Sequence, residues 1–113
     1  MLIVEPGAFR TNFLSAVQKT DKSLSEPYRG GPVDDMLGKF ESAQGKQPGD
    51  AEKAVARIFG AVTGEGVAGD LKGKVLRLPL GPDCMSRIEV KLKSVSADLE
   101  ASREVAMGTN IDG

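Results

Sequence analysis

The residues of this chain best suited to chemistry follow its first apolar segment, at Pro6, Gly7 and Thr11. Three branched apolar residues at 2–4 predict a buried strand, and Pro6 ends its ladder because proline has no N–H to donate. Gly7 allows the backbone to approach a ligand closely, and Thr11 can cap a following helix or direct its hydroxyl at a ligand. Ligands of open α/β sheets bind at the carboxyl ends of the strands. This turn is therefore a candidate wall of a binding site.

Other reactive side chains are few. The chain has no His, which removes the usual nucleophile-His-carboxylate triads and the commonest metal ligand. Cys84 stands alone, so it can form no internal disulfide or multi-thiolate zinc site, and packing is its expected role. Tyr28 has no lysine at helical spacing and is assigned no chemistry. Asp34 and Asp35 are interpreted as a solvated helix start, and no metal site is predicted.

Strands and a connecting helix must position the turn. Residues 1–5 and 74–79 have the composition of strands, and Pro79 is expected to stop the second one. An amphipathic helix over 51–63, capped by Asp50, connects them and allows parallel pairing, which predicts an α/β fold. Its sheet-facing residues are expected to be Ala54, Val55, Ile58, Phe59 and Val62.

The remaining segments are a lobe and a long helix. Residues 12–49 are interpreted as a helical lobe, with a short helix from Thr11 to Lys19 and another over 33–41. A long C-terminal helix over 82–106 carries apolar residues at Ile88, Leu92, Val95 and Leu99. This stripe is either a partner-binding surface or the face that packs on the chain's own sheet, and packing is preferred. The tail, 107–113, is expected to fray.

Size and charge restrict the class of protein. The 113 residues fit one small domain, which by size scaling could bury about two-thirds of its unfolded surface. Fifteen Lys and Arg balance 16 Asp and Glu, so charge does not favour nucleic acid or an acidic membrane as a partner. No apolar run approaches the roughly 20 residues of a membrane helix, and no basic-hydrophobic leader opens the chain. Together with the single cysteine, this predicts a soluble, cytoplasmic protein.

Three motifs occur in order: Pro6-Gly7-Ala8-Phe9-Arg10-Thr11, Gly49-Asp50-Ala51-Glu52-Lys53-Ala54 and Arg77-Leu78-Pro79-Leu80-Gly81. In this order and at this spacing they resemble the C-terminal portion of the short-chain dehydrogenases/reductases, which are NAD(P)-dependent oxidoreductases of alcohols and ketones. The resemblance covers essentially the whole chain and implies the C-terminal part of a Rossmann-like doubly wound fold. In that fold, 1–11 would be a strand and turn, 12–49 the substrate lobe, 50–81 a helix and the last strand, and 82–106 the C-terminal helix.

The resemblance also implies roles for individual residues. In the family, main-chain groups after the Pro-Gly pair hold the nicotinamide carboxamide of NAD or NADP with help from the Thr hydroxyl. These groups correspond to Phe9 and Thr11 here, while Pro6, Gly7 and Ala8 would shape the same wall. The physical fit is good, because a turn leaving a strand end offers the N–H donor and the C=O acceptor that a carboxamide needs.

Two features of the family have no counterpart in this sequence. The segment 64–69 has Gly-x-Gly-x-x-Gly spacing, but it ends a helix instead of opening one, so it is not a phosphate cradle. The catalytic Tyr-x-x-x-Lys is missing, because Tyr28 is the single tyrosine and Pro32 stands four residues later. We therefore expect weak or absent NAD(P) binding and no turnover by this chain alone. A strand at residue 1 favours a fragment or a truncated gene model.

A second interpretation is a non-catalytic interaction module derived from the same fold. Exposed strand edges invite pairing with another chain. In the family, the last strand and the helix before it often contribute to subunit contacts. This interpretation predicts self-association or pairing through residues 51–62 and 75–78.

Overall fold

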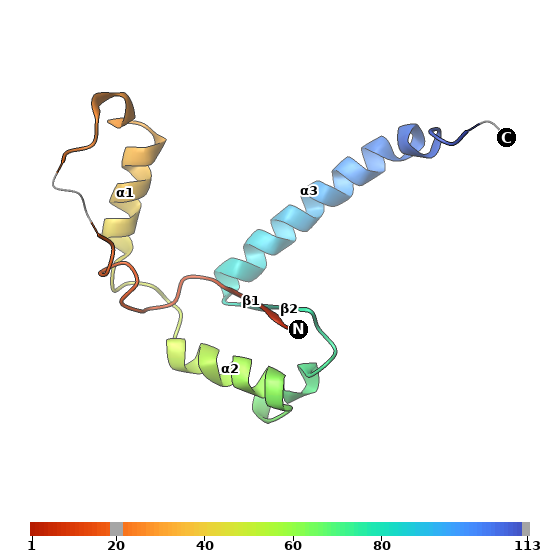
Figure 1. Cartoon of the computed structure of the whole chain (residues 1–113), viewed down its shortest axis with the longest axis horizontal. Helices are drawn as coiled ribbons and strands as arrows, with labels where there is room; N and C mark the ends of the chain where they lie inside the picture. The colour runs from red at the N-terminus through yellow and green to blue at the C-terminus, as the bar shows by residue number, and fades with distance from the viewer. Residues whose placement is uncertain (19–21, 112–113) are drawn as a thin grey trace.

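A computed structural model describes residues 1–18 and 22–111 (Figure 1). The elements in chain order are strand β1 (Ile3–Pro6), the short 3₁₀ helix η1 (Glu26–Tyr28), α1 (Pro32–Ala43), α2 (Ala51–Thr63), the 3₁₀ helix η2 (Gly66–Leu71), β2 (Arg77–Leu80) and α3 (Pro82–Met107). The predicted α/β class, the helix between the two strands and the long C-terminal helix are confirmed.

The two strands pair in parallel, as predicted, from Ile3 opposite Arg77 to Pro6 opposite Leu80. Each strand begins later than the predicted ranges 1–5 and 74–79 and ends one residue further on. The expectation that Pro79 stops β2 is wrong, because this residue lies opposite Glu5 inside the strand. In the part of the chain that the structure describes, β2 pairs with β1 alone, and a strand with a free edge tolerates proline.

A small core lies between α2 and the strands. Its buried members are Ala61, Ala68, Leu78 and Leu80, and the residues packed against them are Leu2, Val4, Phe9, Ala54 and Ile58. Asp50 begins α2 as predicted, because its carboxylate accepts the N–H groups of Glu52 and Lys53 at 3.0 and 3.1 Å. Gly64 ends the helix in the left-handed conformation, with φ 90°.

The predicted sheet-facing side of α2 is only partly correct. Ala54 and Ile58 pack on the core, but Val55, Phe59 and Val62 are 64%, 57% and 57% exposed. The two strands are too narrow to cover a helix with apolar residues on two adjoining sides. The uncovered side of α2 borders a shallow apolar depression that continues to Gly66.

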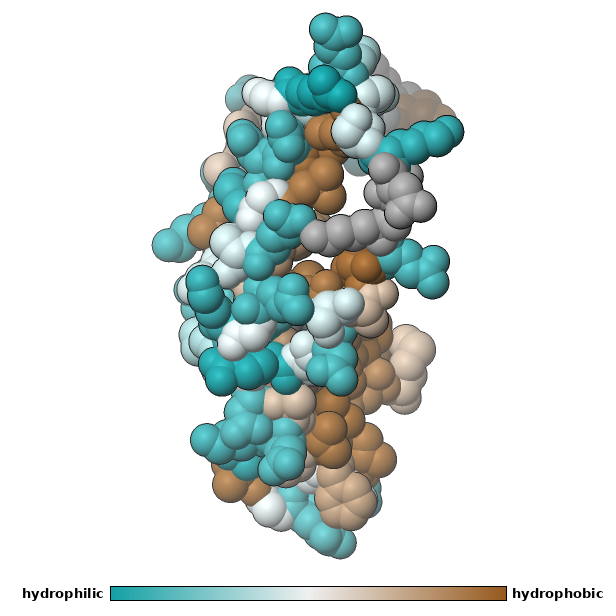
Figure 2. Space-filling model, turned by 90° about the vertical axis from the view of Figure 1, so that its left-hand side faces the viewer, coloured by the Kyte–Doolittle hydropathy of each residue, from teal (hydrophilic) through white to brown (hydrophobic). Residues whose placement is uncertain are grey.

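The molecule is extended, and the expectation of a domain that buries two-thirds of its surface is wrong. Its radius of gyration is 20.6 Å, against about 13 Å for a compact domain of this length. Its accessible surface is 9547 Å², against about 5,900 Å² for a compact protein of this mass. By the same scaling the chain buries about 45% of its unfolded surface. Figure 2 shows the consequence, since hydrophobic side chains lie open on this face beside α1 above and α2 below.

The lobe differs from the prediction at its start. Asn12 to Ala16 form a single turn, closed by an N–H to C=O bond of 2.9 Å between Ala16 and Asn12, in place of the predicted helix from Thr11. Lys19, its predicted end, lies outside the described residues. The apolar residues here are too few to stabilise a short helix, and Phe13 is 75% exposed. The second predicted helix is present as α1, which extends two residues beyond the predicted range and one residue before it.

The long helix α3 leaves the strands and runs to the C-terminal end as a separate rod (Figure 1). The preference for packing of its apolar stripe is wrong for most of its length: Ile88 is half-buried, but Leu92, Val95 and Leu99 are 60%, 48% and 60% exposed. Only the first turns of α3 reach the strands, so the sheet of this chain cannot cover the rest.

Candidate functional site

The candidate site lies where both strands end. Parallel pairing puts the carboxyl ends of β1 and β2 at the same edge, so the turn after Pro6 meets the start of α3. The Gly7 N–H donates to the Leu80 carbonyl at 2.7 Å, which extends the ladder by one residue past Pro6. The Ala8 N–H then donates to the Asp83 carboxylate at 2.9 Å. The Pro-Gly turn is thus anchored to residues more than 70 positions away in the sequence.

Asp83 is the side chain that fixes this turn. A Cβ atom on Gly7 would overlap its carboxylate, and Gly81, with φ 101°, passes the same group at close range. Two glycines therefore make the space that the carboxylate occupies. The Ala8 N–H stabilises the charged form and lowers the pKa of Asp83, with smaller contributions from main-chain N–H groups of the first turn of α3 and from Arg87. A negative charge at a helix N-terminus is favourable in any case.

Phe9 connects the turn to the start of α2. The N–H of Gly49 donates to Ala8 C=O at 3.0 Å, and the N–H of Arg10 donates to Gly49 C=O at 2.8 Å, so Phe9 and Gly49 form a parallel bridge. Consecutive peptide groups of an extended segment point to opposite sides, so the N–H and C=O of Phe9 face away from Gly49. Neither has a hydrogen-bond partner within the described residues. The Phe9 ring itself packs on the core.

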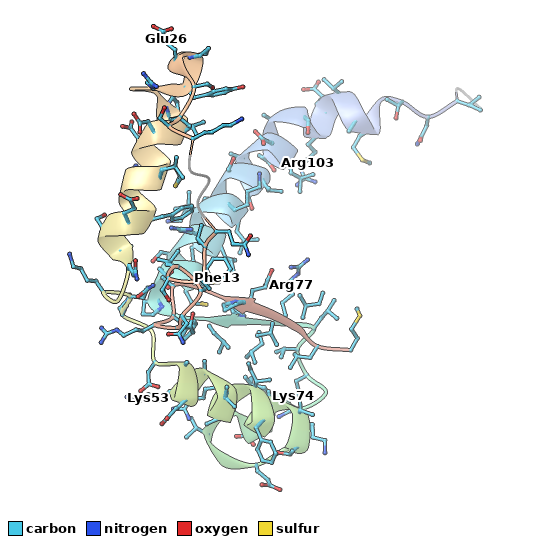
Figure 3. The ribbon with its side chains drawn as sticks, turned by 60° about the vertical axis from the view of Figure 1, so that its left-hand side comes forward. Phe13, Glu26, Lys53, Lys74, Arg77 and Arg103 are labelled. Carbon is cyan, nitrogen blue, oxygen red and sulfur yellow. The ribbon has the colours of Figure 1, made fainter. Side chains whose placement is uncertain are left out.

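The other predicted cofactor-binding residues surround this free peptide pair. Pro6 and Ala8 are exposed, Gly7 is half-buried and Thr11 is exposed. The Thr11 hydroxyl oxygen accepts the Phe13 N–H at 3.3 Å, which leaves its own proton available to a ligand. Figure 3 shows Phe13 just beyond the carboxyl end of the strands, at the entrance to the lobe. The five predicted residues thus form one continuous turn in which Pro6, Ala8 and Thr11 are exposed and Gly7 and Phe9 are half-buried.

Two neighbours of the site were not predicted. Asp83 was assigned only to the start of the last helix, since nothing local in the sequence indicates its bond to Ala8. Gln47 is 92% buried, its carbonyl accepts Arg10 Nε at 3.2 Å, and its side-chain Oε1 has no partner among the described residues. Gly49 was noted as a motif residue, but its bridge with Phe9 depends on tertiary pairing.

The opposite face of the strands carries a structural ion pair. Glu5 and Arg77 alternate with the core-facing Val4 and Leu78, and their side chains pair across the two strands. In Figure 3, Arg77 projects from β2 on the side away from α2. The Cys84 thiol donates to the Glu5 carbonyl at 3.1 Å, so it links α3 to β1 as a packing contact. These groups stabilise the scaffold of the site.

Other motif residues lie elsewhere. The 64–69 segment ends α2 and continues into η2, before β2, in the position expected from the sequence. Tyr28 ends η1 at the far end of the lobe and is 55% exposed. Asp34 and Asp35 occupy the exposed first turn of α1, where Asp34 accepts the Gly30 N–H at 2.8 Å. Across the described residues, no three His, Cys, Asp or Glu side chains gather as metal ligands.

Comparison of the chain with protein-family models, with curated proteins and with solved structures finds no match. None of the helices in the described ranges has the length and apolar character needed to cross a membrane.

Proposed function

We propose that this chain is the nicotinamide-side wall and substrate lobe of a dinucleotide-binding oxidoreductase fold, related to the C-terminal part of the short-chain dehydrogenases/reductases. The observation that carries the proposal is the free peptide pair of Phe9 at the carboxyl end of β1. A carboxamide has one C=O and one NH₂ group, so a single N–H and C=O pair without a hydrogen-bond partner matches both. The proposed cofactor is NAD or NADP.

The surroundings of Phe9 support this assignment. Asp83 and Gly49 hold the turn from one side, so the free groups of Phe9 are presented by a fixed segment on the other side. Thr11, two residues on, can donate its hydroxyl proton to the same carboxamide oxygen. The missing side chain of Gly7 makes room for the Asp83 carboxylate that holds the turn. The lobe, 12–49, then adjoins the wall and would receive the alcohol or ketone substrate.

The proposal also predicts that the chain alone does not convert substrate. Hydride transfer in the family requires an acid such as its tyrosine, and Tyr28 lies at the far end of the lobe with Pro32 four residues on. The segment 64–69 follows α2 and leads only into the short 3₁₀ helix η2, so it opens no α-helix whose N-terminus could bind a pyrophosphate. The adenosine and pyrophosphate halves of the cofactor thus have no predicted contacts here.

Fluorescence titration with NADH and with NADPH tests the extent of the site. Because one wall supplies few contacts, we expect dissociation constants above about 1 mM, which corresponds to about 4 kcal/mol of binding free energy. No oxidation of either nucleotide should occur with ketone substrates. Binding in the micromolar range, or turnover, would contradict the proposal of an incomplete site.

A second candidate function is a non-catalytic interaction module, and the exposed side of α2 favours it. Val55, Phe59 and Val62 are more than half exposed, and among the described residues β2 pairs with β1 alone, so its other edge is free. This surface, within 51–62 and 75–78, would pair with a second copy or a relative. Light scattering on the Phe59→Lys variant tests it, because loss of association by this variant supports the module and unchanged association contradicts it.

A further inference from the structure

We propose that the free part of α3 associates with α3 of a second copy of this chain through a coiled-coil seam. The seam consists of Met85, Ile88, Leu92, Val95, Leu99, Ser102 and Ala106. These positions alternate steps of three and four residues, which is the a and d pattern of a heptad repeat. Its large apolar residues span the two heptads from Met85 to Leu99, and the small residues Ser102 and Ala106 continue the positions. The four large residues other than Ile88 are 44–60% exposed.

The period of the pattern distinguishes this seam from the face of an ordinary surface helix. On a straight helix of 3.6 residues per turn, an apolar face with a period of 3.6 residues runs parallel to the axis, whereas a 3.5-residue repeat drifts by about 20° per heptad and calls for a supercoiled partner helix. The seam of α3 keeps a strict period of 3.5 residues, which fits a neighbouring helix and not a sheet. Val90, 68% exposed, lies off the seam on the outer face.

The isolation of α3 requires a neighbour. Among the described elements, α3 packs against β2, and in Figure 1 nothing lies beside its C-terminal half. Most helical stability in proteins comes from packing of an apolar face, and most of the 26 residues of α3 have no such packing within the described chain. The molecule exposes about 3,600 Å² more than a compact protein of its mass. The lobe, α2 and α3 share this excess, which exceeds the roughly 1,600 Å² buried in a standard stable interface.

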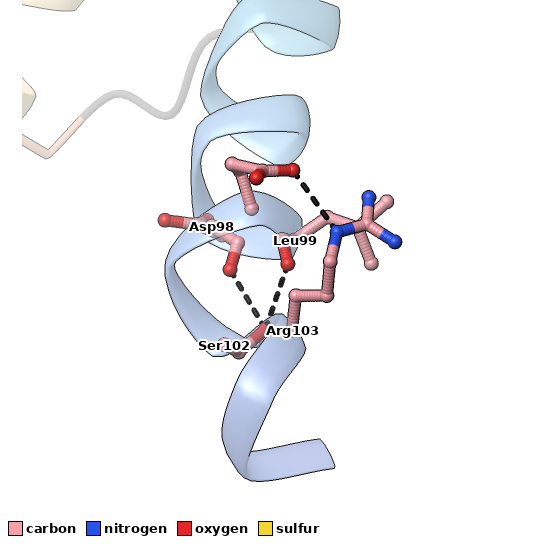
Figure 4. A network of polar contacts seen from close by, with 5 residues as sticks. Asp98, Leu99, Ser102 and Arg103 are labelled. Atoms are coloured by element: carbon pink, nitrogen blue, oxygen red, sulfur yellow. Dashed lines mark hydrogen bonds and ion pairs between the residues drawn. The ribbon is translucent and has the colours of Figure 1, made fainter. Parts of the chain in front are cut away.

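Charges beside the seam favour a second copy as the occupant. In a parallel, in-register pair, each g residue faces the e residue five positions on in the other helix. Asp98 then faces Arg103 of the second copy, twice per pair, while Lys91 faces an uncharged serine, Ser96. No like charges meet at these positions. In the single chain, Arg103 pairs with Glu100 of its own helix at 3.1 Å (Figure 4). The Arg103 side chain is 59% exposed in this pair, so Asp98 of a second copy can reach it.

Sedimentation velocity and light scattering over about 1–500 μM test the seam, with circular dichroism to monitor helix content. We expect the wild-type chain to reach the mass of two or more copies. Leu92→Lys/Leu99→Lys puts charges into the seam and should raise the dissociation constant at least about 100-fold. The matched control is Val90→Lys, which places the same charge on the same helix off the seam and should associate like the wild type.

The outcomes separate this surface from that of α2. A wild-type chain that stays monomeric to the highest concentration overturns the proposal, as does a Leu92→Lys/Leu99→Lys variant that associates normally. Association that is abolished by Phe59→Lys and retained by the seam variant would assign the contact to α2 and overturn the seam.

A charge exchange tests the parallel orientation. Asp98→Arg and Arg103→Asp should each weaken self-association, and an equal mixture of the two variants should restore it. Failure of the mixture to recover contradicts the parallel arrangement.

Discussion

Replacing Leu78 by alanine should release the candidate site from its scaffold. Leu78 lies on β2, is 6% exposed and contacts a core that contains two alanines, Ala61 and Ala68. The substitution removes three carbon atoms, worth about 2.4 kcal/mol of transfer free energy. Small neighbours cannot close the cavity, which raises the expected cost to about 3 kcal/mol. Leu76, 53% exposed in the segment before β2, is the matched control, and its truncation should cost about 1 kcal/mol.

Hydrogen exchange at the Gly7 amide measures this cost at the site itself. This N–H bonds to the Leu80 carbonyl and exchanges when the two strands separate. A loss of 3 kcal/mol should accelerate its exchange about 100-fold in Leu78→Ala, against about 5-fold in Leu76→Ala. Equal protection of Gly7 in the two variants, or no change in Leu78→Ala, would refute the conclusion that this small core positions the turn.

Three further predictions concern the residues that hold the turn and α2. Asp50→Ala removes the cap of α2 and should lower the free energy of unfolding by about 1 kcal/mol in urea denaturation. Gly7→Ala should displace the Asp83 carboxylate and shift the Ala8 amide resonance. The control for this change is Gly38→Ala in α1, where a Cβ meets open space, and it should slightly stabilise that helix. The lowered pKa of Asp83 predicts a contribution to stability that is fully present above the ordinary carboxyl pKa and lost as the pH falls through the lower folded value. Asp83→Asn should remove that pH dependence. An NMR titration of the Asp83 carboxyl in the wild type, and of the Ala8 amide in both proteins, would follow it.

Each of these predictions has a result that contradicts it. Unchanged urea denaturation of Asp50→Ala would mean that the cap does not stabilise α2. An Ala8 resonance that is the same in Gly7→Ala and wild type would contradict the close approach of the carboxylate. If Asp83 titrates at or above the ordinary carboxyl pKa, its bond from the Ala8 N–H is absent in solution.

Local patterns in the sequence predicted most of the helices and strands of this chain, because the start and end of a helix or strand depend on residues that are neighbours in sequence. Asp50 and Gly64 bound α2 as their types and positions indicated, and Ile3 and Val4 begin β1. The expectation that residues 2–4 form a buried strand is wrong in part, because Leu2 precedes β1 and all three residues are half-buried. The parallel pairing followed from the helix between the strands. The turn was placed correctly after Pro6, the last residue of β1. The expectation that Pro6 ends the ladder is wrong, because the Gly7 N–H continues it to the Leu80 carbonyl.

Features that depend on contacts between distant residues could not be predicted in this way. The bond of Ala8 to Asp83 and the bridge of Phe9 with Gly49 require the register of the folded chain. Size scaling assumes a compact domain, so it overestimated burial in a chain that covers α2 on one side and leaves α3 free. The stripe on α3 stays mostly exposed because the strands reach only the first turns of this helix, and the proposal of a helical neighbour rests on its 3.5-residue period.

The most direct test of the proposed site is an NMR titration of the chain with reduced nicotinamide mononucleotide, which carries the carboxamide without the adenosine half. The account predicts saturable shifts confined to the amides around Phe9 and Thr11, with a dissociation constant in the millimolar range, and weaker binding by Thr11→Val. The amide of Val90 on α3 is the internal control and should not move. Absence of shifts at Phe9 at about 10 mM ligand, or equal shifts over the whole chain, would contradict the claim that this turn holds a nicotinamide.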